Sequence, residues 1–322
     1  MISPTKLALA LCIAVSVVSA GCGGKDKPAD GASASKNMED DPVMLLPAPA
    51  AAVAVLDAKA LAAHPTFGKD LATFEDKYMF VGEEAGFKAS RDVEKIYLAT
   101  YSLQGADVLG VLVGKFDEAK IKDAMANQKT KYGGTLVASP YGGKDIYTMN
   151  NAGFTVLSSK TALCGTEAAI RRSLDRVRDK KMSRDIDAWM LETLDTNGAA
   201  FAGAGDFSSG VLKDIKSPVM AIDGIMQMQR ARVIGNFKEP GINVAAAVTY
   251  PDEAKAVTAK EQIEKLKRLL PLLGAIGVPA PQDLQLKVDK ADVQITFGLE
   301  GAAISAFLTR TAPGMMPSPP AK

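Results

Sequence analysis

The apolar positions of the chain alternate in short runs and recur every three or four residues in longer ones. Alternation predicts strands, and the longer spacing predicts helices that bury one stripe. Candidate capping residues, such as Thr166 and Asp252, stand at the start of two predicted helices. Strands are predicted at 51–57, 94–103, 106–115, 199–206 and 241–250, and hairpins at 135–149, 152–164 and 284–300. Helices are predicted at 58–78, 117–129, 166–181, 184–195, 210–232, from 252, and at 301–311.

The order of these elements predicts an α+β fold with a mainly antiparallel sheet and helices packed on one face. A repeated motif also favours two duplicated halves. VGKFDEAK at 113–120 and VTYPDEAK at 248–255 both place a strand end, then Asp-Glu-Ala-Lys, then a helix. Convergent capping is the alternative, because Asp followed by Glu favours a helix start anyway. The predicted halves are 51–182 and 183–312, followed by a disordered tail at 313–322.

The N-terminal segment has the pattern of an export signal. One basic residue, Lys6, precedes an apolar run from Leu7 to Val18, which is too short to span a bilayer. The small residues Ser19, Ala20 and Gly21 come next, directly before Cys22. The chain then turns polar and small, and such a composition does not fold by itself.

This N-terminal arrangement resembles a bacterial lipoprotein signal, in which acyl chains are attached to the cysteine and cleavage occurs just before it. The resemblance covers residues 1–25 and departs from the usual pattern at Ser19, where an aliphatic residue is usual. It implies a signal peptide at 1–21, lipidation of Cys22, and a flexible tether at 22–50. An ordinary cleavable signal, with Cys22 incidental, is the alternative.

The same resemblance implies an address in the cell envelope. Gly23, rather than Asp, follows the cysteine. By the sorting rule of the family, this favours the outer membrane, with the domain facing the periplasm or the exterior. The expected partner is therefore the membrane, through the lipid anchor. A further pattern, GF…RDV…IYLA at 86–99, is weakly similar to uncharacterised bacterial lipoprotein families and implies no function.

Composition argues against nucleic-acid binding and against metal sites. The chain has 38 basic and 37 acidic residues, a formal net charge of +1, and so no global field that would attract nucleic acid. Cys12 lies in the signal segment and Cys22 is the expected lipidation site, so one Cys and one His remain, which are too few ligands for a zinc site of the usual type, and we expect no metal and no cofactor. We interpret Cys164 as a thiol that packs like a small hydrophobe, with a reactive thiol as the alternative.

Signatures of catalysis are weak. A Ser-His-Asp site would need His64, the single histidine, which stands before Pro65 and is interpreted as structural. The stretch GAGDFS at 203–208 approaches a dinucleotide fingerprint, but Ser208 replaces the third glycine and no convincing parallel βαβ unit is predicted around it. The sequence therefore favours a protein that is not an enzyme, and a hydrolase with an unconventional site is the rival hypothesis.

Two groups of side chains are candidates for binding. The helix after Thr166 belongs to a basic segment with a local charge of +5, which indicates either a contact for anionic headgroups or an acidic partner, or a solvated helix face. A methionine-rich stripe within 211–230 indicates either an apolar pocket or core packing. The residues are Arg171, Arg172, Arg176 and Arg178 in the first group, and Met220, Ile225, Met226 and Met228 in the second.

Together these features predict a membrane-anchored extracytoplasmic lipoprotein that acts as a binding or scaffolding module. Carriage of a lipid or another apolar ligand between the two halves is the alternative within the binding class.

Overall fold

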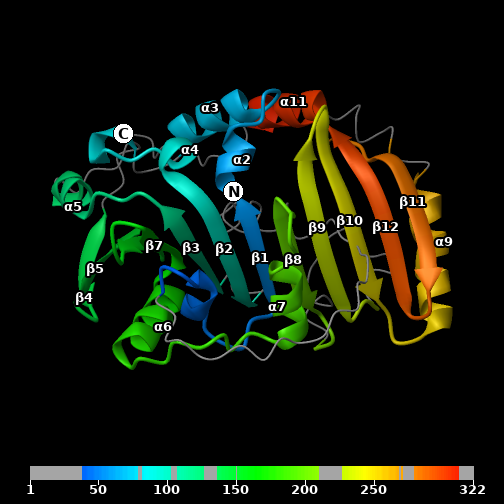
Figure 1. Cartoon of the computed structure of the whole chain (residues 1–322), viewed down its shortest axis with the longest axis horizontal. Coiled ribbons are helices and arrows are strands. Elements are labelled where there is room, and N and C mark those ends of the chain that lie inside the picture. The colour runs from blue at the N-terminus through cyan, green and yellow to red at the C-terminus, as the bar shows by residue number, and fades with distance from the viewer. Residues whose placement is uncertain are drawn as a thin grey trace, which may run out of the picture.

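One antiparallel sheet of twelve strands organises the described part of the chain (Figure 1). This arrangement confirms the predicted α+β fold with a mainly antiparallel sheet. Cys22, Met220, Ile225 and Met226 lie outside the described residues. The computed structural model describes residues 38–78, 82–102, 107–126, 136–149, 151–209, 227–267, 270 and 279–311.

The strands match the predicted runs except for one, β9, which falls partly within a stretch predicted as helix and otherwise unassigned. In chain order the strands are β1 (Ala52–Asp57), β2 (Val93–Ser102), β3 (Asp107–Gly114), β4 (Val137–Tyr141), β5 (Lys144–Met149), β6 (Ala152–Val156), β7 (Thr161–Thr166), β8 (Phe201–Asp206), β9 (Arg230–Lys238), β10 (Gly241–Thr249), β11 (Gln282–Asp289) and β12 (Asp292–Glu300).

The helices that the structure describes at predicted positions lie close to them, and the predicted break at His64-Pro65 separates α2 from α3. The helix α4 is not among the predicted elements, and the predicted helix at 210–232 lies largely outside the described residues. The α-helices are α2 (Ala58–Ala62), α3 (Gly68–Tyr78), α4 (Ala89–Asp92), α5 (Glu118–Ala126), α6 (Glu167–Arg178), α7 (Ala188–Leu194), α9 (Glu253–Lys267) and α11 (Gly301–Thr311), with short 3₁₀ helices η1 (Pro42–Leu45) and η2 (Glu83–Ala85).

The order of the strands repeats on the two sides of the β1–β8 pair. The sheet runs β11-β12-β10-β9-β8-β1-β2-β3-β7-β6-β5-β4. Outward from the centre, β1-β2-β3-β7-β6 on one side corresponds to β8-β9-β10-β12-β11 on the other. The two helices that carry the repeated motif, α5 and α9, each follow the third strand of their half. The matching topology supports the predicted duplication.

Both motif helices begin with the same side-chain cap. The backbone N–H of Lys120 donates to Asp117 Oδ1 at 3.1 Å, and that of Lys255 donates to Asp252 Oδ1 at 2.8 Å. Such a cap stabilises a helix by about 1 kcal/mol. Because capping alone would produce this motif, the repeated strand order is the stronger argument for duplication.

The first half buries both faces of its sheet. Val111 and Leu163 belong to a core under α6 and α7, whereas their neighbours Leu112 and Ala162 pack in a core with α5. Consecutive residues of a strand point to opposite faces. Helices therefore cover both faces here, and the prediction of helices on one face is wrong in that detail.

Residues 38–46, which we call the strap, are part of the first core. Val43, Leu45 and Leu46 are at most 2% exposed and pack in the same cluster as β3 and α6. The prediction that the tether extends to residue 50 is therefore wrong from residue 38 onward, because the apolar run of η1 is buried. The same core contains Met190 and Leu194 of α7. A boundary at residue 183 would thus divide one core.

Candidate functional site

The four predicted arginines of α6 all have carboxylate partners within the fold. N–O distances of 2.5, 2.8, 2.7 and 2.7 Å join Arg171–Glu167, Arg172–Asp107, Arg176–Asp185 and Arg178–Asp175. Across 171–184, six of the seven basic residues pair with a total of seven carboxylates, which are Asp41, Asp107, Glu167, Asp175, Asp179, Asp185 and Asp195. The local charge of +5 in the sequence therefore falls to about zero in the folded protein.

Arg176 is an interior side chain. It is 9% exposed, and its guanidinium donates to Met44 O at 3.0 Å, to Ser183 O at 2.7 Å and to Asp185 Oδ2 at 2.7 Å. A buried guanidinium with protein acceptors on three sides has no open face for an external anion. The prediction of Arg176 as part of an anionic contact is therefore wrong.

The other three arginines remain at the surface, with side chains 36–55% exposed. Two of them also stack on tyrosines. Arg171 lies over the ring of Tyr141 at 4.4 Å, and Arg172 lies over the ring of Tyr101 at 4.6 Å. Ring stacking and ion pairing use part of each guanidinium, so an anionic contact at these residues stays a prediction.

Arg184, beyond the end of α6, holds the start of the strap. Its Nε donates to Asp41 Oδ2 at 2.7 Å and its Nη1 to Asp195 Oδ2 at 2.5 Å. Asp41 is 3% exposed, and hydrogen bonding to Asp41 is the main cause of a raised pKa of Arg184. The sequence analysis missed this pair, although an acidic residue directly before the buried run of η1 is the signal that points to it.

His64 is packed rather than presented to solvent. The imidazole is 6% exposed and stacks on Phe67 with ring centroids 3.8 Å apart. Its Nδ1 accepts the backbone N–H of Thr66 at 3.3 Å, and its Nε2 lies 3.7 Å from Glu239 Oε1. That separation exceeds the roughly 2.6–3.2 Å at which a general base and its carboxylate partner interact. These contacts favour the structural interpretation of His64.

Cys164 faces a glycine across the sheet. It pairs with Gly110 of β3, and a Cβ at Gly110 would stand 2.7 Å from the thiol sulfur and 3.3 Å from Leu98. The missing side chain of Gly110 therefore leaves the room that the thiol fills. This packing supports the interpretation of Cys164 as a small hydrophobe.

The glycines of GAGDFS serve sheet packing. A Cβ at Gly205 would stand 2.7 Å from the Phe207 ring, and one at Gly203 would stand 3.0 Å from Val233. Their strand, β8, runs antiparallel to both neighbours, β1 and β9. The motif thus lacks the βαβ setting of a dinucleotide site.

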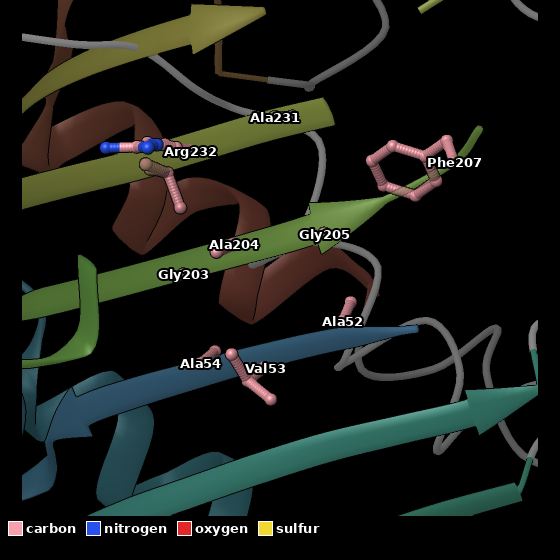
Figure 2. A pocket seen from close by; sticks show the side chains of 10 residues that line it. Ala52, Val53, Ala54, Gly203, Ala204, Gly205, Phe207, Ala231 and Arg232 are labelled. Carbon is pink, nitrogen blue, oxygen red and sulfur yellow. The ribbon is translucent and has the colours of Figure 1, made fainter. Parts of the chain in front are cut away.

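A small hollow lies over the β1–β8–β9 seam, where the two halves meet (Figure 2). Its floor consists of small residues, and its space for water is about 30 Å³, which holds one or two waters. Ligand pockets measure roughly 300–1,000 Å³. The hollow is therefore too small for a lipid. Its lining is Ala52, Val53, Ala54, Gly203, Ala204, Gly205, Phe207, Ala231, Arg232 and Val233.

Met228 is the one residue of the methionine stripe within the described part of the chain. It packs against the core formed by β10, β12 and α9, which includes Val248 and Val293. This position favours core packing for Met228. In the described stretches, no group of three or more His, Cys, Asp or Glu side chains is placed to hold a metal ion.

One face of the second half presents a partly exposed sheet surface of mixed polarity. Ile234, Ala245 and Thr296 lie in register across β9, β10 and β12, on the side of the sheet that carries the first core. Ile234 and Ala245 are partly exposed, and Thr296 is exposed, as are Asn243 and Gln285 on the same side. In Figure 1, β9 is the strand of these three that lies nearest to α7. We call these five residues the open sheet face.

Comparison with known proteins shows the fold alone. No family model matches the chain, and no curated protein matches it either. The crystal structures of TP0453 are similar. Crystal form III superposes with a TM-score of 0.54 at 8% identity, covering 84% of this chain and 98% of that one, and form IV with 0.53 at 8%, covering 84% and 96%. Among the described helices, none combines the length and the apolar character needed to cross a bilayer.

Proposed function

We propose that the chain is an extracytoplasmic lipoprotein, anchored by acyl chains on Cys22 in the outer membrane, that acts as a binding or scaffolding module. The sequence supports the anchor, because a short apolar run and small residues precede Cys22 and a polar segment follows it. The described fold includes residues 38–46, and a polar segment of 15 residues, Gly23 to Asn37, separates them from Cys22 in the sequence.

One observation on the described residues favours binding over catalysis: they offer an exposed sheet surface, whereas the hollow at the seam lacks catalytic side chains. They present an extended sheet with an open sheet face, and the hollow over the β1–β8–β9 seam has Arg232 as its one charged lining residue, with no His, Cys, Ser or carboxylate in its lining. His64 and Cys164, the candidates for an unconventional hydrolase, are both packed against neighbouring side chains. The small hollow over the β1–β8–β9 seam does not support carriage of an apolar ligand, because the volume of the hollow is far below that of a lipid.

Native mass spectrometry of the mature protein, extracted in detergent, tests this proposal. A binding or scaffolding module should retain a protein partner or a non-covalent ligand above the mass of the acylated chain. An Ala245→Arg variant, which adds a charge to the open sheet face, should lower the retained fraction if that face contributes, whereas Val257→Arg on the exposed side of α9 is the matched control. Retention of nothing by the wild type, together with turnover of an ester or amide substrate, would favour the hydrolase instead.

A further inference from the structure

The strap runs along the strands across one face of the sheet. At its start, Glu39 accepts hydrogen bonds from Ser158 Oγ at 2.9 Å and Lys160 Nζ at 3.2 Å, in the turn between β6 and β7. After the strap ends, the Ala51 N–H donates to Thr100 O at 2.7 Å, where β1 begins. The strand register places these two points at opposite ends of the strands. The strap therefore spans the first core lengthwise.

The polar groups of the strap are held by side chains rather than by a strand ladder. Arg184 binds the Asp41 carboxylate at 2.7 Å, and Arg176 donates to Met44 O at 3.0 Å. Ser173 Oγ donates to Leu45 O at 2.8 Å. Three side chains on α6 and on the segment after it thus receive consecutive parts of the strap. Two arginines of the basic segment, Arg176 and Arg184, thus bind the strap within the fold, although the sequence alone indicates a surface patch.

The apolar side of the strap points into the same core. Leu45 and Leu46 have no exposed surface, and Met38 packs against the cluster as a partly buried side chain. Apolar burial and the side-chain hydrogen bonds therefore act on the same nine residues. In this fold the chain between Cys22 and β1 divides into a polar stretch, 23–37, and a fixed stretch, 38–46.

We propose that the strap is a clamp that sets the reach of the domain from the membrane, with Arg176 and Arg184 as its positioning residues. The proposal rests on the anchoring at Cys22 proposed above. With the strap held, the tether that the sequence predicts counts 15 residues and would extend to about 50 Å at most, whereas a tether that ran to residue 51 would extend to about 100 Å. The corresponding root-mean-square spans are about 21 and 30 Å.

The clamp limits which partners the module can reach. A partner bound by this domain must present its contact surface near the bilayer, within the span of the short tether plus the domain itself. The partner class that fits is therefore a membrane-embedded or membrane-associated protein of the same envelope surface, rather than a component held far from the bilayer.

Energy transfer from Trp189 to a dansyl-labelled lipid measures this reach directly, because the chain has one tryptophan. The lipidated protein is bound to vesicles of phosphatidylethanolamine and phosphatidylglycerol. The double variant Arg176→Gln, Arg184→Gln should lower the transfer efficiency. Arg178→Gln should leave it unchanged, since Arg178 pairs with carboxylates of its own segment, Asp175 and Asp179. Equal transfer in the wild type and in the double variant would overturn the proposal.

Two further measurements keep the proposal testable if the double variant fails to fold. Inserting ten Gly-Ser residues after Asp30 of the wild type should lower the transfer without touching the strap. Hydrogen exchange should protect the strap amides of Met44 and Leu46, which donate to Asp41 O and Val43 O, in both the lipidated protein and the Cys22→Ala variant. Unprotected strap amides would overturn the clamp. Protected amides in a wild-type protein that takes up no lipid on Cys22 would overturn the anchor and leave the strap as a purely structural element.

Discussion

Replacing Leu45 by alanine should destabilise the protein strongly, although the sequence around this residue has the composition of a flexible tether. Leu45 has no exposed surface and packs in the first core. Truncating a fully buried leucine costs about 2.7–5 kcal/mol, because transfer free energy is lost and a cavity remains. In a unit of this size each kcal/mol lowers the melting temperature by roughly 2–4 °C, so a fall of about 5–20 °C is expected.

The fluorescence of Trp189 during urea unfolding measures this effect, since Trp189 packs against the same cluster. Leu45→Ala should lower the midpoint of the transition without changing its slope. The control is Val257→Ala on α9, where a side chain 41% exposed is truncated and a change within about 0.5 kcal/mol is expected. A Leu45→Ala protein as stable as this control would refute the packing of the strap into the core.

Three other substitutions test separate parts of the structure. In thermal unfolding, Gly165→Ala should lower the stability several times more than Gly143→Ala. Both glycines have positive φ, but a Cβ at Gly165 would stand 2.1 Å from a backbone oxygen of β3, whereas the space around Gly143 is open. Arg176→Gln should cost about 1–3 kcal/mol because it leaves the backbone carbonyls of Met44 and Ser183 without their donor, whereas Arg178→Gln, at an exposed position, should cost much less. Equal losses in urea unfolding would contradict the distinction. The guanidinium of Arg91 holds the pKa of Asp92 below its usual value, so the stability that Asp92 contributes is present above about pH 4 and is lost as the pH falls through the lower folded pKa. Asp92→Asn should therefore be less stable than the wild type at pH 7 and equal to it in strong acid. A constant difference between the two proteins in urea unfolding across pH would count against this.

Local patterns accounted for most of the elements because each depends on nearby residues. The Thr166 cap is an example: its side chain accepts the Ala169 N–H, as the sequence predicts for a helix start. The missed strand, β9, also carries a local signal. Its residues alternate from Arg230 to Lys238 and end at Pro240-Gly241, but the apolar segment before them extended the predicted helix too far.

The strap was missed for a different reason. Small and polar residues from Gly23 onward indicate a tether, and Pro47 and Pro49 extend that impression, although the run Val43–Leu46 just before them is apolar. Whether such a short run is buried depends on a groove formed by β3 and α6, which are far away in the sequence. No local pattern contains that information.

The charges of the basic segment were misread for the same physical reason. Asp175 and Asp179 are close in the sequence and were counted, whereas Asp107 reaches Arg172 from β3 and Asp41 reaches Arg184 from the strap. Contacts across 65 and 143 positions are set by the tertiary fold. The sequence therefore indicated where the arginines cluster but not that the cluster is neutral inside the folded protein.

Metabolic labelling with a fatty acid tests the central claim, the anchoring of this domain through Cys22, most directly. The wild-type protein, expressed in a bacterium that processes lipoproteins, should take up the label and sediment with the membranes. The Cys22→Ala variant should take up none and leave the membrane fraction. A mature wild-type protein without label, or a Cys22→Ala protein that still carries it, would contradict the account.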